Sequence, residues 1–182
     1  MPAERERALV ARAREDAAAF AELYDFYMPR VYGFVYRRVR DRAAAEDLTS
    51  VTFQRALENV RRADFRNESF GGWLYRVASN AVVDQVRRDR RTVPMDDVDA
   101  EGPSDLALDT LAAALDRDQL RRALKRLPDN HREVIVLRFY DDLDTGEMCA
   151  VLGCSRETLA VRLHRALRAL RSEVTKESAD VA

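Results

Sequence analysis

The sequence predicts an all-α protein made of two small helical domains joined by a flexible acidic linker. Glycine and proline are scarce, with 6 and 5 among 182 residues, so long stretches of the chain contain no helix breaker. Apolar residues recur along these stretches at helical spacing. The charge is also unevenly distributed, because an acidic segment separates two mildly basic ones. These observations predict two helical modules and a connector between them.

The charge pattern sets the expected domain boundaries. Residues 1–91 carry 18 basic and 14 acidic side chains, and residues 119–176 carry 12 basic and 8 acidic ones. Residues 92–116 carry seven acidic side chains and no basic one, and they include Pro94, Gly102 and Pro103. Like charges repel and proline disfavours helix, so this composition is typical of a linker. We therefore predict domains over 1–91 and 117–176, a linker over 92–116 and a frayed tail over 177–182.

Composition also argues against several classes of protein. No run of about 18 apolar residues occurs, and the charged start of the chain lacks a signal segment, so we expect a cytoplasmic protein without membrane insertion. Cys149 and Cys154 are too few for a secreted disulfide framework, and neither histidine adds a zinc-ligand spacing. No catalytic constellation is visible. We therefore expect no enzymatic activity and no bound metal or cofactor.

Two long helices are predicted at the start of the first domain. The first covers about Ala17 to Val39, and Pro29 can kink this helix or break it. The second covers about Ala43 to Val60. Its helical period turns Leu48, Thr52, Phe53, Ala56, Leu57 and Val60 toward the core. The opposite, outward face comprises Asp47, Ser50, Val51, Gln54 and Glu58.

A third helix and the loop before it carry a signal for nucleic acid. Asn67-Glu68-Ser69 with Gly71-Gly72 predicts an irregular loop, and the helix is expected to begin near Trp73. The helix then presents a polar and basic strip, which comprises Arg76, Asn80, Gln85, Arg87 and Arg88. Aromatic side chains beside arginine suit unstacked, single-stranded bases. The same residues also fit a three-helix bundle with a solvated face, in which Trp73 belongs to the core.

The second domain is predicted to contain a helix-turn-helix. One helix ends at Pro128, and a further one contains Val134, Val136, Leu137 and Tyr140. Asp144 followed three residues later by Glu147 forms a capping box for a short helix from Thr145 to Leu152, which Gly153 ends. Ser155 can then cap a longer helix from Arg156 to about Arg171. A short helix, a glycine-containing turn and a second helix are typical of a helix-turn-helix, although a plain helical hairpin has the same pattern.

The outward face of this last helix is suited to DNA. Leu159, Leu163, Ala166, Leu167 and Leu170 are expected to point inward. The opposite face comprises Glu157, Thr158, Val161, His164, Arg165 and Arg168, with Arg162 at its flank. Arginine can bind phosphates or recognise guanine edges, and the sequence leaves both possibilities open.

Taken together, these segments resemble the extracytoplasmic-function sigma factors over nearly the whole chain. Ala45-Glu46-Asp47-Leu48 and Phe53–Leu57 are similar to the polymerase-binding helix of region two. Phe65–Phe70, Trp73–Ala78 and Asn80 are similar to the segment of region two that recognises the −10 element. Leu127-Pro128, Arg132–Val134, Glu147, Leu152-Gly153, Thr158 and Arg162–Ala166 are similar to region four, which recognises the −35 element.

The resemblance implies three partners, namely core RNA polymerase, promoter DNA and an anti-sigma factor. The expected polymerase-binding residues are Glu46, Asp47, Ser50, Val51, Gln54 and Glu58. The expected −10 residues are Asn67, Glu68, Ser69, Phe70, Trp73, Arg76, Asn80, Arg87 and Arg88, with flipped bases held in a pocket of the 67–72 loop. The expected −35 residues are Arg156, Glu157, Thr158, Val161, Arg162, Arg165 and Arg168, on a helix placed in the major groove. The linker is expected to thread through the polymerase.

The chain departs from the family pattern on two of these surfaces. Ser50 and Val51 stand where the family usually has glutamine and an acidic residue, and a bare valine there indicates an apolar partner surface. In the recognition helix, Leu159, Ala160 and Val161 replace the common valine, lysine and serine. Val161 can pack on a thymine methyl group instead of making a polar contact.

Three other functions stay open on the residues alone. A helix-turn-helix regulator that binds duplex DNA without polymerase explains residues 119–171 but gives Trp73 and the linker no role. A sigma-like adaptor that binds proteins without opening promoters fits the departures described above. An enzymatic function would need a catalytic constellation, and none is visible in the sequence. The linker acids Asp96, Asp97, Asp99 and Glu101 could hold a divalent metal, but such a run is more typical of solvated charge.

Overall fold

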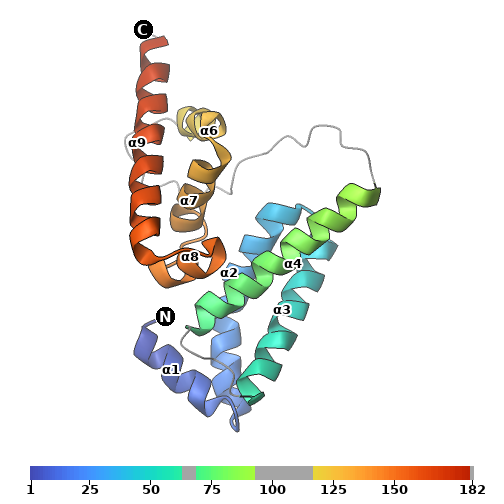
Figure 1. The fold of residues 1–182 in the computed structure, drawn as a ribbon. Helices are drawn as coiled ribbons and strands as arrows, with labels where there is room; N and C mark the ends of the chain where they lie inside the picture. The colour runs from blue at the N-terminus through green and yellow to red at the C-terminus, as the bar shows by residue number, and fades with distance from the viewer. Residues whose placement is uncertain (63–68, 93–116, 181–182) are drawn as a thin grey trace. The chain divides into compact units, whose positions relative to one another are not determined.

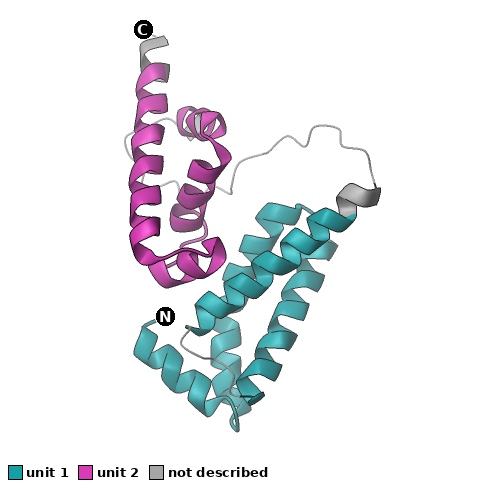
Figure 2. Cartoon of the chain, viewed as in Figure 1, with its two compact units in different colours: residues 1–98 teal, residues 99–182 magenta. Residues whose placement is uncertain are grey.

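The computed structural model of the chain describes residues 1–62, 69–92 and 117–180, and every regular element in these ranges is an α-helix. The chain forms two compact units, Met1–Val98 and Asp99–Ala182 (Figures 1 and 2). The all-α prediction with two helical groups is thereby confirmed. The division between the units falls within the predicted linker, of which residues 93–116 lie outside the described ranges. None of the helices described is long and apolar enough to cross a bilayer.

The first unit contains helices α1 (Ala3–Arg12), α2 (Ala17–Val39), α3 (Arg42–Arg62) and α4 (Phe70–Thr92). Helix α2 has the predicted bounds and continues through Pro29. It begins where Asp16 Oδ1 accepts a hydrogen bond from the backbone N–H of Ala18 at 2.9 Å. Helix α1 was not predicted, because half of its side chains are charged and its buried residues are only Leu9 and the charged Glu6.

Helices α2, α3 and α4 enclose the core of the first unit, and Figure 1 shows α4 crossing both of the others. Aromatic rings join them in pairs. Phe34 of α2 meets Tyr75 of α4 edge to face, with centroids 5.4 Å apart, and Tyr27 of α2 packs against Phe70 of α4 at 5.5 Å. Tyr75 is 1% exposed, so this aromatic side chain stabilises the bundle and is not presented to solvent.

The second unit contains α6 (Arg117–Arg126), α7 (Asp129–Phe139), α8 (Thr145–Leu152) and α9 (Arg156–Asp180). One cluster of buried side chains joins α6, α7 and α9. Its members are Leu120, Ala123, Leu124, Leu127, Ile135, Ala166 and Leu170. Because α9 contacts α6, α7 and α8, it is the central element of this unit.

Two predicted helix bounds were wrong. Helix α4 begins at Phe70 and not near Trp73, so Gly71 and Gly72 lie in its first turn. Helix α9 does not end at about Arg171 but continues to Asp180, across most of the predicted frayed tail. No glycine or proline follows Gly153 in the chain, Val174 packs against the core cluster, and Lys176 pairs with Glu173 at 2.8 Å. These features explain the longer helix.

Candidate nucleic-acid and polymerase surfaces

The first turn of α4 is held by side chains from two parts of the chain. Ser69 Oγ accepts a hydrogen bond from the backbone N–H of Gly72 at 3.0 Å, and the Ser69 carbonyl accepts one from Trp73 at 3.0 Å. The carboxylate of Glu6 accepts hydrogen bonds from the backbone N–H groups of Phe70 at 2.9 Å and Gly71 at 3.3 Å. Four N–H groups at the start of the helix therefore have acceptors.

The outward face of α4 carries four of the nine predicted −10 residues. Residues 73, 76, 80 and 87 follow spacings of three, four and seven, which place them on one side of a helix. Trp73 and Arg76 are half-buried, whereas Asn80 and Arg87 are exposed. Arg88 is exposed beside this face and donates a hydrogen bond to Gln85 Oε1 at 2.8 Å. The structure thus brings an indole, an amide and guanidinium groups together on one solvent-facing stripe.

This stripe contains one residue that the sequence analysis missed. Val83 occupies the position between Asn80 and Arg87 and is 44% exposed. Its helical position indicated that it is exposed, because the inward-facing residues of α4 lie on the opposite side. The stripe of Trp73, Arg76, Asn80, Val83 and Arg87, called the α4 stripe below, therefore mixes polar, basic and apolar groups.

The loop residues predicted for the −10 site do not all fit that prediction. Phe70 is 2% exposed and its ring belongs to the core, because the helix starts earlier than expected and turns this side chain toward Tyr27. Its ring is therefore not available to stack on a base, and Phe70 is removed from the candidate surface. Ser69 is exposed at the start of the helix. Asn67 and Glu68 lie outside the described residues.

The outward face of α3 carries the residues predicted to bind core polymerase. The six predicted polymerase-binding residues are all exposed, namely Glu46, Asp47, Ser50, Val51, Gln54 and Glu58. Val51 is 39% exposed, so it presents an apolar patch among acidic and polar neighbours. Glu46 forms an ion pair with Arg42 at 2.8 Å. The predicted orientation of α3 is confirmed, with Leu48, Thr52, Phe53, Ala56 and Val60 buried and Leu57 half-buried.

Helices α8 and α9 form the predicted helix-turn-helix with the predicted caps. Asp144 and Glu147 make the reciprocal capping box at the start of α8. Gly153 ends α8 with φ 59°, a left-handed conformation that glycine adopts without strain. Ser155 Oγ then accepts a hydrogen bond from the backbone N–H of Thr158 at 3.3 Å and caps α9. The two caps and Gly153 therefore fix the conformation of the turn between α8 and α9.

The α9 face predicted to contact DNA is exposed. Arg156, Glu157, Thr158, Val161, Arg162, Arg165 and Arg168 are all solvent-exposed, and Leu159, Ala166 and Leu170 on the other side are buried. A hydrogen bond with Ser155 holds the pKa of Glu157 below its usual range and so favours the ionised carboxylate. An ionised glutamate can accept from a cytosine amino group, arginine can bind guanine or phosphate, and Val161 can contact a thymine methyl.

Comparisons with known proteins match both units of the chain. The Sigma-70 region 2 family matches residues 23–92, and the Sigma-70 region 4 family matches residues 117–170. The chain is 34% identical over 164 residues to the ECF RNA polymerase sigma factor SigK of Mycobacterium tuberculosis, covering 88% of each. It is also 34% identical over 166 residues to the ECF RNA polymerase sigma factor BldN of Streptomyces coelicolor, covering 89% of this chain and 63% of BldN.

The fold is similar to that of solved sigma factors as well. The sigma factor RpoE of Bartonella quintana, solved with the anti-sigma factor NepR, matches with a TM-score of 0.58 and 22% identity, over 86% of this chain and 96% of that one. At that identity the similarity concerns the fold alone. The family follows from the sequence matches, in which region 2 contains α4 and region 4 contains the helix-turn-helix. The chain therefore belongs to the family of ECF RNA polymerase sigma factors.

Proposed function

We propose that this protein directs core RNA polymerase to specific promoters and initiates transcription there. The observation that carries the proposal is the presence, in one chain, of a region 2 with the exposed α4 stripe and a region 4 with an exposed basic face on a capped recognition helix. A duplex-only regulator would need the second surface but not the first.

Each surface has a proposed partner. The outward face of α3, with Asp47, Gln54 and Glu58, binds core polymerase. Ser69 and the α4 stripe contact the −10 element, where an indole and arginines suit opened, single-stranded bases. The α9 face lies in the major groove of the −35 element, with Arg165 and Arg168 on phosphate or guanine. The protein acts by binding and not by catalysis, in the cytoplasm, where polymerase and DNA are found.

An anti-sigma factor is the proposed regulator. Support comes from the fold match to RpoE in its complex with NepR and from family membership. The exposed Val51 on α3 offers an apolar contact that a protein partner can cover. If the anti-sigma factor covers the outward face of α3, it competes with core polymerase for the same residues.

A sigma-like adaptor that binds proteins but opens no promoter is the second candidate. It is favoured by the exposed valines, Val51 at 39% and Val161 at 50%, which place apolar groups on the polymerase and −35 surfaces. The adaptor function predicts protein binding through α3 without specific recognition of promoter DNA.

Run-off transcription separates the two functions. Purified core polymerase is combined with this protein and a genomic promoter library, and a housekeeping sigma factor serves as the positive control. We expect transcripts that depend on this protein and start downstream of a shared pair of sequence elements. Active core polymerase that gives no such transcripts, although the protein binds it, would support the adaptor function and contradict the proposal.

A further inference from the structure

Glu6 is a buried carboxylate at which three helices of the first unit meet. Its side chain lies on α1, and the residue is 5% exposed. It accepts hydrogen bonds from the backbone N–H groups of Phe70 and Gly71 on α4 and from the hydroxyl group of Tyr27 on α2. A buried carboxylate is costly unless such donors compensate for the lost water. These hydrogen bonds join Glu6 to the first residue of α4, Phe70, which lies 64 residues later in the sequence.

The contact explains why α4 begins where it does. Glycine is a poor helix former, so Gly71 and Gly72 favour a helix that starts only at Trp73. Glu6 offsets this preference, because its carboxylate provides acceptors for two N–H groups of the first turn and places a negative charge at the positive end of the helix. The first turn of α4 therefore depends on a side chain from α1 as well as on its own Ser69 cap.

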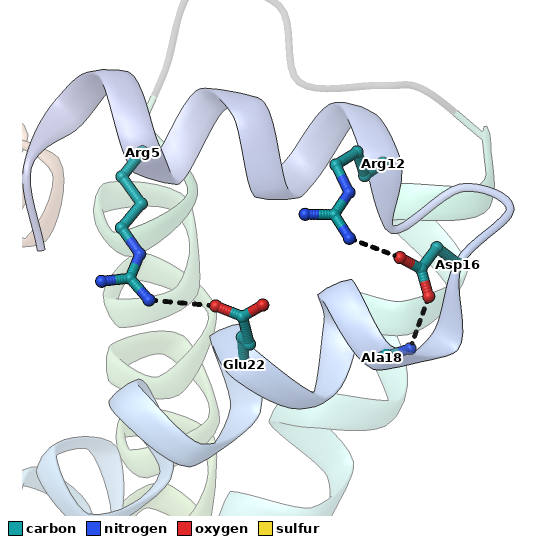
Figure 3. Close-up of polar contacts among 5 residues, drawn as sticks. All are labelled: Arg5, Arg12, Asp16, Ala18 and Glu22. Carbon is teal, nitrogen blue, oxygen red and sulfur yellow. Dashed lines mark hydrogen bonds and ion pairs between the residues drawn. The ribbon is translucent and has the colours of Figure 1, made fainter.

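Helix α1, which carries Glu6, is joined to the start of α2 by two ion pairs (Figure 3). Arg5 forms an ion pair with Glu22 of α2 at 3.0 Å. Arg12 forms another with Asp16 at 2.7 Å, and the same Asp16 caps α2 through Ala18. Leu9 adds an apolar contact, since it is 3% exposed. Residues 3–12 lie outside the span 23–92 that matches region 2.

We propose that Glu6 is a positioning residue for promoter opening. It fixes the first turn of α4 and thereby the placement of Ser69 and Trp73, which belong to the proposed −10 surface. Because Glu6 is buried, it acts through α4 and does not touch DNA itself. This inference rests on the proposed function, since it assigns α1 a part in the step in which region 2 opens the promoter.

The test uses Glu6→Gln in the full chain, assembled with core polymerase. Glutamine has nearly the same shape, but its amide nitrogen is a donor and cannot accept from a backbone N–H. We expect about tenfold fewer open complexes, scored by permanganate reactivity of −10 thymines, because charged hydrogen bonds to the helix start are lost. Core-polymerase binding and −35 duplex binding should stay unchanged, since the hydrogen-bond donors to Glu6 lie on α2 and α4 and the α9 face belongs to the other unit.

Val35→Ala is the matched control. It removes buried volume from α2 at a residue that takes no part in the hydrogen bonds of Glu6, and both variants are assayed well below their unfolding midpoints. If the control opens promoters normally and Glu6→Gln does not, the result supports a positioning role for Glu6. Equal opening by Glu6→Gln and the control overturns the proposal, as does an equal defect in both. A wild-type chain that opens no promoter refutes the proposed function instead, and the proposal with it.

Hydrogen exchange of the wild-type chain keeps the inference testable if Glu6→Gln does not fold. The proposal requires the amide protons of Phe70 and Gly71 to exchange slowly, as hydrogen-bonded groups at a fixed helix start do. Slow exchange there supports the proposal. Exchange as fast as in an unstructured loop overturns it, because the first turn would then not be held by Glu6.

Discussion

Asp144 and Glu147 cap each other at the start of the helix-turn-helix. Asp144 Oδ1 accepts a hydrogen bond from the backbone N–H of Glu147, and Glu147 Oε2 accepts one from the backbone N–H of Asp144, both at 2.8 Å. Glu147 is 6% exposed, so this exchange takes place largely out of solvent. The pair therefore fixes the start of α8, and α8 in turn supports the recognition helix α9.

Removing this cap should destabilise the second unit. We expect Asp144→Ala to lower the free energy of unfolding of α8 by about 1 kcal/mol, because the N–H of Glu147 loses its acceptor. Hydrogen exchange of α8 amides, followed by mass spectrometry, should accelerate about fivefold. Glu133→Ala is the control, since Glu133 is exposed on α7 and caps no helix. Equal exchange rates in the two variants would show that the capping box does not stabilise α8.

Charge reversal on α3 should weaken binding to core polymerase. Asp47 is exposed, so Asp47→Arg should leave the far-ultraviolet circular dichroism spectrum and the unfolding midpoint unchanged. Affinity for core polymerase, measured by fluorescence anisotropy of a labelled chain, should fall because an acidic contact becomes basic. Glu15→Arg makes the same charge change at an exposed position between α1 and α2. If both variants bind equally well, the polymerase-binding surface lies elsewhere.

The arginines of α9 should dominate the salt dependence of −35 binding. Arg165→Ala or Arg168→Ala should each weaken binding to duplex −35 DNA. If the lost contact is to phosphate, the slope of log affinity against log salt should decrease by about 1 for each arginine. If it is to guanine, the loss should be about 1–3 kcal/mol and confined to one base position. Arg126→Ala, an exposed arginine on α6, should change neither quantity. Wild-type behaviour of all three variants would refute the assigned face.

The thiol of Cys149 should react slowly at neutral pH. Burial, with the neighbouring thiol of Cys154, raises the pKa of Cys149 above its ordinary value, so less thiolate is present at a given pH. In a Cys154→Ser variant, which removes the competing thiol, alkylation of the folded chain should be slower than that of the urea-unfolded chain. The ratio should approach one as the pH rises through the raised pKa. A folded chain that alkylates faster at neutral pH would contradict this direction.

The sequence predicted the elements whose signals are local. The bounds of α2 and α8 and the start of α9 follow from caps and periodicity a few residues away, and the structure has the same residues at these positions. The exposed faces of α3 and α9 were predicted for the same reason. The helical period places Leu48 and Asp47 on opposite faces of α3, and it does the same for Leu159 and Val161 on α9.

The parts that were not predicted depend on contacts distant in sequence. Gly71 and Gly72 were assigned to a loop because their local preference is unfavourable for helix, and the acceptor that reverses this preference is Glu6. No periodicity links Glu6 to Phe70, so neither the early start of α4 nor the burial of the Phe70 ring was visible in the sequence. The exposed Val83 was not predicted, although its helical position opposite the inward-facing residues of α4 indicated it.

Promoter opening by the α4 stripe is the central claim, and permanganate reactivity of −10 thymines in the polymerase complex tests it most directly. The wild-type complex should show reactive thymines, because opened bases need the polar and aromatic groups of this stripe. Asn80→Ala should abolish that reactivity while binding core polymerase and duplex −35 DNA normally, since Asn80 is exposed on α4 and lies on neither of the other surfaces. Full reactivity with Asn80→Ala would contradict the −10 assignment, and a wild-type complex without reactive thymines would contradict the function itself.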